Sequence, residues 1–267
     1  MMFKLALQDI LGGLKKYHFW SYMAWQEILI RYRRSVLGPF WITASTAIYV
    51  VSISTVFAAL FHQDIRHYLL YMALGIMIWN YINQTVVETA DSFIANSGFI
   101  KQIQIEKTVF IFQAITRNIY FFLHNAVVLI ICLLFLDSTL TLYTVGKALF
   151  GFGILTFNLF FLALTLSCLC TRFMDLRQII LSILQIGMLV TPIMWIPTES
   201  MRTKAFILEW NPLYHFIDFI RFSLLPPDFP PAVMHPSLTY IMVFTVINTL
   251  VGFIVFAKSR KNISYWV

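Results

Sequence analysis

Residues 148–170 read ALFGFGILTFNLFFLALTLSCLC, an apolar run without a charged side chain. A helix needs about 20 consecutive apolar residues to cross the hydrocarbon core of a bilayer, so this run predicts a transmembrane helix. Five more apolar runs of comparable length occur at residues 39–61, 68–87, 109–136, 179–196 and 238–257. The sequence therefore predicts an all-α integral membrane protein with six transmembrane helices.

The composition of the chain also indicates a membrane protein. Of 267 residues, 60% are hydrophobic and 12% are charged, whereas a soluble domain has about half and about a quarter. Six spans use nearly the whole chain, so we expect one transmembrane domain at residues 37–267 and no separate soluble module. Residues 1–36 precede it as a cytoplasmic interface segment.

The N-terminal segment has the pattern of an amphipathic helix. Apolar residues recur there at helical spacing, and polar residues lie opposite to them. The apolar set is Phe3, Leu7, Ile10, Leu11 and Leu14, and the polar set is Lys4, Gln8, Asp9 and Lys15. Such a helix is expected to lie in the interface between lipid and water.

The distribution of basic residues predicts the orientation in the membrane. If both ends are inside, fourteen of the 19 lysines and arginines fall in inner segments, and cytoplasmic loops are where the excess belongs. We therefore expect cytoplasmic N- and C-termini. The formal net charge of +7 is then explained by contact with anionic lipid headgroups, and no nucleic acid partner is expected.

The sequence lacks the patterns of ATP hydrolysis and of metal chemistry. No GxxxxGK loop followed by Ser or Thr occurs, so this chain cannot bind and hydrolyse ATP by that route. Any energy must come from a partner or from a gradient. The three cysteines lie within apolar runs without zinc-ligand spacing, so we expect no metal and no cofactor bound by this chain. A membrane-embedded transferase would need clustered carboxylates or histidines. The carboxylates in question are scattered, at Asp137, Glu199, Glu209, Asp218 and Asp228.

His124 is the one ionisable residue near the centre of an apolar run. Ionisable groups at this depth are costly, so a proton-transfer site is one interpretation. A lone histidine on a packed helix is more often a hydrogen-bonded structural residue, and we expect that role here.

Aromatic residues make up 17% of the chain and occur within the spans as well as at their ends. Aromatic faces stack on the apolar faces of sugar rings, and hydroxyl and amide groups bond to sugar hydroxyls, so such a lining suits a sliding glycan. Residues of these types share single helix faces. The candidate substrate-pathway residues are Ser45, Tyr49, Ser52, Tyr71, Trp79, Gln178, Ser182 and Gln185. The alternative is that they pack helices together.

The outer connection between the fifth and sixth runs, residues 197–237, is too apolar for a plain exposed loop. Short helices that dip back into the membrane would satisfy their own backbone hydrogen bonds, so we expect re-entrant helices there. A polymer channel also needs an apolar plug against ion leak. The candidates for an external gate are Trp195, Phe206, Trp210, Tyr214, Phe216 and Phe219. The alternative is that these aromatic residues anchor the outer interface.

The largest inner loop, residues 95–107, reads ANSGFIKQIQIEK. A short helix there would present polar side chains to a partner, and the alternative is a solvated connector. The candidates for coupling to an energy-supplying partner are Glu27, Arg31, Lys101, Gln104, Glu106 and Lys107. Arg117 lies nearer the inner surface and is a candidate phosphate contact, with snorkelling to the lipid headgroups as the alternative.

Residues 28–41 read ILIRYRRSVLGPFW, a basic helix end that runs into an LGxxW pattern. This stretch resembles the start of the permease subunits of type 2 ATP-binding-cassette exporters, especially those for O-antigen and capsular polysaccharide. Further matches follow in the same order along the chain. They are Gly75 with Trp79, Arg172 with Asp175, Thr191 with Pro192, and Asn211 with Pro212 and Arg221. The resemblance covers residues 27–221.

The resemblance implies a homodimer of this chain with two separate ATPase subunits, in the inner membrane of a bacterium. ATP and Mg²⁺ are then bound by the ATPase subunits, and this chain is a transporter subunit that is not itself an enzyme. Its substrate would be a lipid-linked glycan moved outward from the inner leaflet. The alternatives are a permease for a drug or a simple lipid and, from another class, a membrane-embedded glycosyl or acyl transferase.

Overall fold

The computed structural model describes residues 2–135, 141–197, 206–226, 229 and 236–267. These residues form helices and connections and contain no β-strand. The longer helices are α1 (Met2–Lys15), α2 (Tyr17–Tyr32), α3 (Phe40–Leu60), α4 (Ile65–Ala90), α7 (Thr108–Phe135), α8 (Leu142–Arg172), α9 (Leu176–Val190), α11 (Pro212–Leu224) and α12 (Leu238–Ser259). The short helices are α5 (Ser92–Ala95), α6 (Ser97–Gln102), α10 (Phe206–Glu209) and α13 (Ile263–Trp266).

Four of the described helices are long and apolar enough to cross a membrane, namely α3, α7, α8 and α12. This confirms an all-helical chain with several candidate spans. The other two predicted spans correspond to α4, which has 26 residues, and to α9, which is apolar but has 15 residues. The total of six spans and the re-entrant helices remain predictions.

Two helix boundaries differ from the apolar runs for local reasons. The run at residues 179–196 is longer than α9, which ends at Val190 because Thr191 is extended and precedes Pro192. Proline disfavours helical geometry in the residue before it and has no N–H to donate. In contrast, α8 starts six residues before the run at 148–170, because Thr141 and Thr144 form a reciprocal capping box at its first turn.

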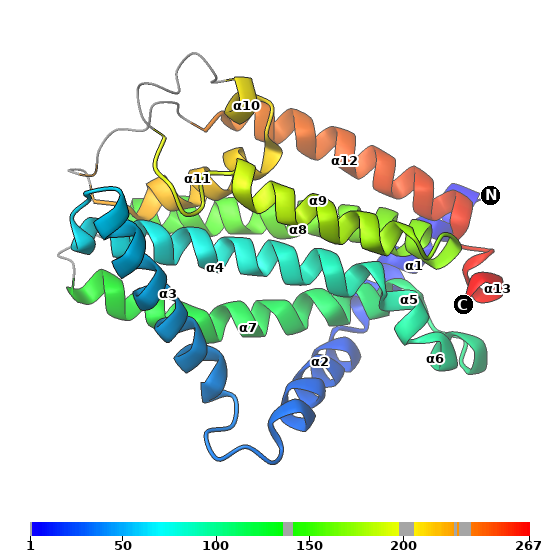
Figure 1. Cartoon of the computed structure of the whole chain (residues 1–267). Helices are drawn as coiled ribbons and strands as arrows, with labels where there is room; N and C mark the ends of the chain where they lie inside the picture. The colour runs from blue at the N-terminus through cyan, green and yellow to red at the C-terminus, as the bar shows by residue number, and fades with distance from the viewer. Residues whose placement is uncertain (1, 136–140, 198–205, 227–228, 230–235) are drawn as a thin grey trace.

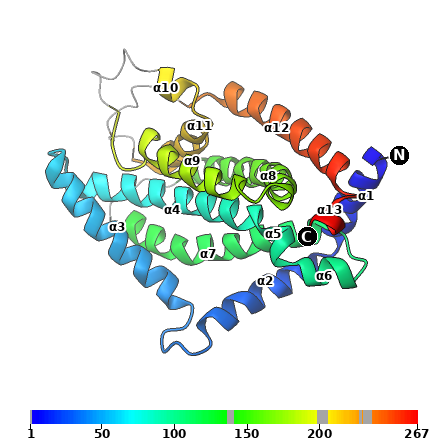
Figure 2. The same cartoon turned by 45° about the vertical axis from the view of Figure 1, so that its right-hand side comes forward.

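The helix α8 lies at the centre of the packing and contacts α4, α11 and α12. Its contact with α12 is close at Gly252, where an added Cβ would lie 2.4 Å from the backbone oxygen of Phe161. On another side of the molecule, α4 lies between α7 and α9, as Figures 1 and 2 both show. Among the described residues of α9, Ile183, Ile186 and Leu189 are exposed.

Both chain termini lie at the same end of the molecule, together with α5 and α6 (Figure 1). A buried carboxylate joins the helices there. Asp9 of α1 accepts hydrogen bonds from the backbone N–H of Thr108 at 3.1 Å and from Nε of Arg260 at 2.6 Å. The sequence pattern placed Asp9 opposite to the apolar residues of this helix, and its side chain is fully buried there against Thr108 of α7 and Arg260, which follows α12. The exposed large apolar residues of α1 are Met2, Phe3, Leu7, Leu11 and Leu14.

Candidate functional site

A hollow of about 390 Å³ lies between α4 and α9, and we call it the α4–α9 hollow. Residues at helical spacing on one face of each helix form its wall. From α4 these are Trp79, Asn83, Gln84, Val87 and Glu88, and from α9 they are Leu181, Leu184, Gln185 and Met188. An indole, three amides and a carboxylate therefore meet apolar side chains in one concave surface, which is the usual composition of a site for a small ligand.

Two side chains of α7 hold the carboxylate of Glu88 in place. Arg117 Nη2 lies 2.7 Å from Glu88 Oε2, and Asn118 Nδ2 donates to the same oxygen at 2.8 Å. Arg117 also pairs through Nη1 with Glu27 of α2. Gln113 Nε2 donates to the other oxygen of Glu27 at 2.6 Å. These five residues form an inner ion network that joins α2, α7 and α4.

Only part of the predicted pathway set lies in the α4–α9 hollow. Trp79 and Gln185 are in its wall, and Gln178 and Ser182 lie exposed on α9. The three residues on α3 are exposed and lie outside it, at Ser45, Tyr49 and Ser52. Asn83, Gln84 and Glu88 also lie in this wall and were not predicted as pathway residues. Their spacing from Trp79 was the available signal, since it places them on or beside the same face of α4.

Tyr71, the eighth pathway candidate, is fully buried in a second cluster, which we call the outer clasp. Its hydroxyl donates to the backbone oxygens of Pro192, at 2.9 Å, and Trp195, at 3.1 Å. The Arg221 guanidinium lies 3.9 Å from the centre of the Tyr71 ring and donates to the Pro192 oxygen at 2.8 Å. Arg221 Nη1 also lies 2.9 Å from Asp218 Oδ1. The outer clasp therefore fastens the segment after α9 to α4 and α11.

The predicted gate residues separate into two groups. Tyr214, Phe216 and Phe219 of α11 are buried in the protein core, whereas Phe206 and Trp210 are exposed. Trp195 is partly exposed, and its indole N–H donates to the backbone oxygen of Leu189 at 3.1 Å. Residues 198–205 of the connection lie outside the described residues, as do three of the scattered carboxylates, Asp137, Glu199 and Asp228. The external gate remains a prediction. Phe206 and Trp210 are the two candidates with strongly exposed side chains.

The predicted coupling residues from α6 onward lie at the end of the molecule that carries both termini, and several of them bond within the chain. Lys107 Nζ donates to the backbone oxygen of Arg260 at 3.0 Å and to Ser264 at 2.9 Å, and burial lowers the pKa of this lysine. Burial alone would raise the pKa of Glu106, but the ion pair with Lys16, at 2.5 Å, lowers it overall. Lys101 and Gln104 are exposed.

The remaining candidates, from α2 and α7, have partners from the protein itself. Arg31 lies 5.4 Å from the centre of the Phe121 ring. Glu27 and Arg117 belong to the inner ion network, so Arg117 already contacts two carboxylates where a phosphate contact was expected. His124 Nδ1 lies 2.8 Å from the backbone oxygen of Tyr120, which is the kind of hydrogen bond that a structural histidine makes.

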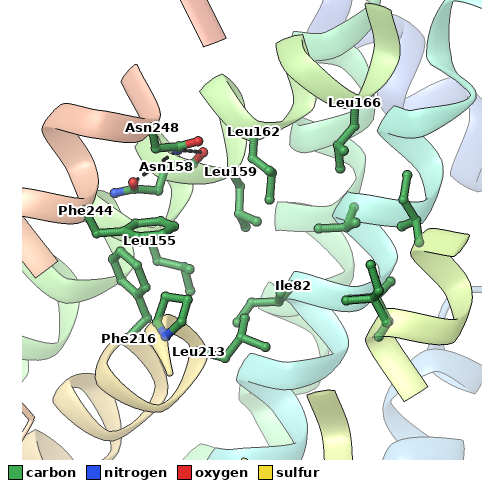
Figure 3. A pocket seen from close by; sticks show the side chains of 15 residues that line it. Ile82, Leu155, Asn158, Leu159, Leu162, Leu166, Leu213, Phe216, Phe244 and Asn248 are labelled. Carbon is green, nitrogen blue, oxygen red and sulfur yellow. Dashed lines mark hydrogen bonds between the residues drawn. The ribbon is translucent and has the colours of Figure 1, made fainter. Parts of the chain in front are cut away.

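A second hollow, of about 260 Å³, lies among α4, α8, α9, α11 and α12 and is apolar (Figure 3). Leucine side chains such as Leu155, Leu159 and Leu162 form much of its wall. Its two amides, Asn158 and Asn248, bond to each other, with Nδ2 of Asn248 3.2 Å from Oδ1 of Asn158. This apolar hollow suits a hydrocarbon group rather than a sugar.

The helices and the two hollows define a multi-pass membrane protein with concave surfaces among its spans. The family described as ABC-2 type transporter matches residues 18–225. The chain therefore belongs to the ABC-2 type transporter family, which confirms the resemblance drawn from the motifs, and it is a transporter component rather than an enzyme. Two relatives in Klebsiella pneumoniae are described as O-antigen export system permease protein RfbA. One is 23% identical over 248 residues and the other 24% over 244 residues, and each alignment covers 88% of this chain and 89% of the relative.

Proposed function

We propose that this chain is the permease subunit of an ATP-driven exporter that moves a lipid-linked polysaccharide, of the O-antigen or capsule type, out of the cytoplasm. The observation that carries the proposal is the α4–α9 hollow, in which Trp79 and the amides of Asn83, Gln84 and Gln185 meet. An indole face and amide groups suit sugar rings and hydroxyls without ionic bonds that would stop movement. Family membership and the similarity to the two RfbA permeases support the same substrate class.

We propose further that the chain crosses the bacterial inner membrane six times, with α4 and α9 as the second and fifth spans and both termini in the cytoplasm. Residues 37–267 then form one membrane domain behind the interface segment at residues 1–36. The common position of the termini, α5 and α6 at one end supports an even number of crossings (Figure 1).

Cysteine labelling tests this topology, because the three native cysteines are buried. Single cysteines at the exposed positions Gln63 and Thr141 are expected to react with a membrane-impermeant maleimide applied from outside. Cysteines at Lys101 and Tyr265, which are also exposed, are expected to react only after the membrane is opened. Outside labelling at Lys101 in sealed cells would contradict the orientation.

The proposed assembly is a homodimer of this chain with two ATPase subunits, on which ATP and Mg²⁺ are bound. The cytoplasmic segment around α6 supports this arrangement, because Lys101 and Gln104 remain exposed there for a partner. No cofactor is proposed for this chain.

Purification of the tagged chain from its native membrane tests the assembly. The expected result is recovery of a nucleotide-binding chain in equal amount, and loss of most of it when Lys101 and Gln104 are both replaced by glutamate, because two negative charges then face the partner. Asp64→Asn, at the opposite end of α4, is the matched control and is expected to retain the partner, since Asn also caps helices well. Recovery of the wild-type chain without any ATPase would overturn the proposed function.

The apolar hollow favours a second candidate function, a permease for a simple lipid. Its leucine-rich wall fits a hydrocarbon chain and offers no free polar group to a sugar among the residues described there. The two functions are distinguished by the exported product, which carries a glycan polymer in the first case and none in the second.

A further inference from the structure

We propose that the α4–α9 hollow accepts uncharged, hydroxyl-rich sugar units, and that Glu88 binds their hydroxyl groups and disfavours anionic sugars. This inference rests on the proposed function and narrows its substrate class. Glu88 is the specificity-determining residue in this reading, and Arg117 is the positioning residue that holds it.

The charge of the hollow supports a neutral substrate. Glu88 is the one ionisable side chain among the described residues of its wall. Behind it, Arg117 is shared by two carboxylates, Glu88 and Glu27, so these three groups together carry one net negative charge when ionised. Like charges repel strongly in surroundings of low dielectric constant. Channels and pores use such fixed charges to select what passes.

The hydrogen-bonding capacity of Glu88 also favours hydroxyl groups. Arg117 and Asn118 both bond to Oε2, and the side chain remains 22% exposed where it meets the hollow. An ionised carboxylate only accepts hydrogen bonds, so its complement must be a donor. A sugar hydroxyl is such a donor, whereas an ionised phosphate group or the carboxylate of a uronate offers none. The amides of Asn83, Gln84 and Gln185 in the same wall can donate and accept.

Arg117 has the geometry to hold Glu88 in place. Its Nη2 meets Glu88 of α4 while its Nη1 meets Glu27 of α2, so one guanidinium connects both. Lysine keeps the positive charge but presents a single ammonium in place of the rigid fork, and it cannot reproduce this bridge. A substitution of Glu88 therefore changes the charge of the hollow, whereas Arg117→Lys keeps the charge and changes how Glu88 is positioned.

The experiment measures export by the full transporter in cells that lack their own exporter. One strain makes a neutral glycan and the other makes a uronate-containing glycan on the same lipid carrier. Because Glu88 repels the uronate, the wild-type chain is expected to export the neutral polymer at least about tenfold faster. Glu88→Gln, of similar size, is expected to raise export of the acidic polymer about fivefold and to lower export of the neutral one about threefold, because a neutral amide accepts a weaker hydrogen bond than a carboxylate.

Two further variants separate charge from position. Arg117→Lys keeps the net charge, so it is expected to lower export of the neutral polymer about fivefold while the preference over the acidic polymer persists. Asp64→Asn removes a negative charge far from the hollow and is expected to leave both rates unchanged.

Equal export of the two polymers by the wild-type chain, or an unchanged ratio in Glu88→Gln, would overturn the inference and leave the proposed function standing. If an assembled complex of normal yield exports neither polymer, the proposed function fails and this inference with it.

Discussion

An Arg221→Met variant is expected to lose about 3–5 kcal/mol of folding stability, because it leaves the Asp218 carboxylate buried without its cation. Both side chains are almost completely inaccessible, at 0% for Arg221 and 2% for Asp218. The substitution also removes the donor to the Pro192 oxygen and the cation that lies over the Tyr71 ring. The segment after α9 would then lose part of its attachment to α4 and α11.

The measurement is the thermal unfolding midpoint of the purified transporter, together with the yield of the assembled complex. The double variant Arg221→Met/Asp218→Asn is the control, because it removes both charges. It is expected to recover a substantial part of the lost stability, since a neutral amide costs less to bury than an unpaired carboxylate. If the single variant is as stable as the wild type, the buried pair does not stabilise the outer clasp.

The motif matches included residues of the outer clasp but did not indicate that these residues contact one another. Gly75, Pro192 and Arg221 are far apart in the sequence, and the pattern could order them but could not place them in contact. In the structure they belong to one cluster, with Gly75 against the Arg221 side chain. Tyr71 shows the same limit, because its spacing suggested a pathway residue while its hydroxyl bonds to the chain itself.

The helices were largely predictable, because long apolar runs correspond to α3, α7, α8 and α12. The α4–α9 hollow was harder to find, because it depends on how two helices face each other. Glu88 lies one residue after the run at 68–87. It was not predicted as a functional residue, because only ionisable residues near the centres of the runs were expected to be functional. Its partial burial is made possible by Arg117 and Asn118 from α7, which no local pattern in α4 indicates.

For the candidate gate residues and the candidate coupling residues, the sequence did not indicate which side chains are exposed. Exposure follows from tertiary packing, so the sequence could not tell that Tyr214 and Phe216 are buried while Trp210 is exposed. At the end that carries both termini, Lys107 was expected to face a partner, yet it bonds to the backbone of Arg260 and to Ser264. Contacts between segments more than 150 residues apart leave no periodic signal in either segment.

A Gly75→Ala variant is expected to be strongly destabilised, although alanine is the better helix former. An added Cβ would lie 2.1 Å from Nη2 of Arg221 and 2.9 Å from the backbone oxygen of Ile193. The guanidinium is held by Asp218 and by the Pro192 oxygen, and the Ile193 oxygen belongs to the backbone, so neither neighbour can move aside cheaply. Overpacking of this kind costs about 1–3 kcal/mol, and displacement of Arg221 from its partners adds to that loss.

Gly153→Ala in α8 is the matched control, because nothing lies within 4 Å of the Cβ that it adds. In a helix interior this change favours the folded state by up to about 1 kcal/mol. The two variants add the same methyl group, so their thermal unfolding midpoints should move in opposite directions, with Gly75→Ala below the wild type. Equal midpoints for the two variants would show that α4 can shift away from Arg221, and that the close packing at Gly75 does not hold the outer clasp together.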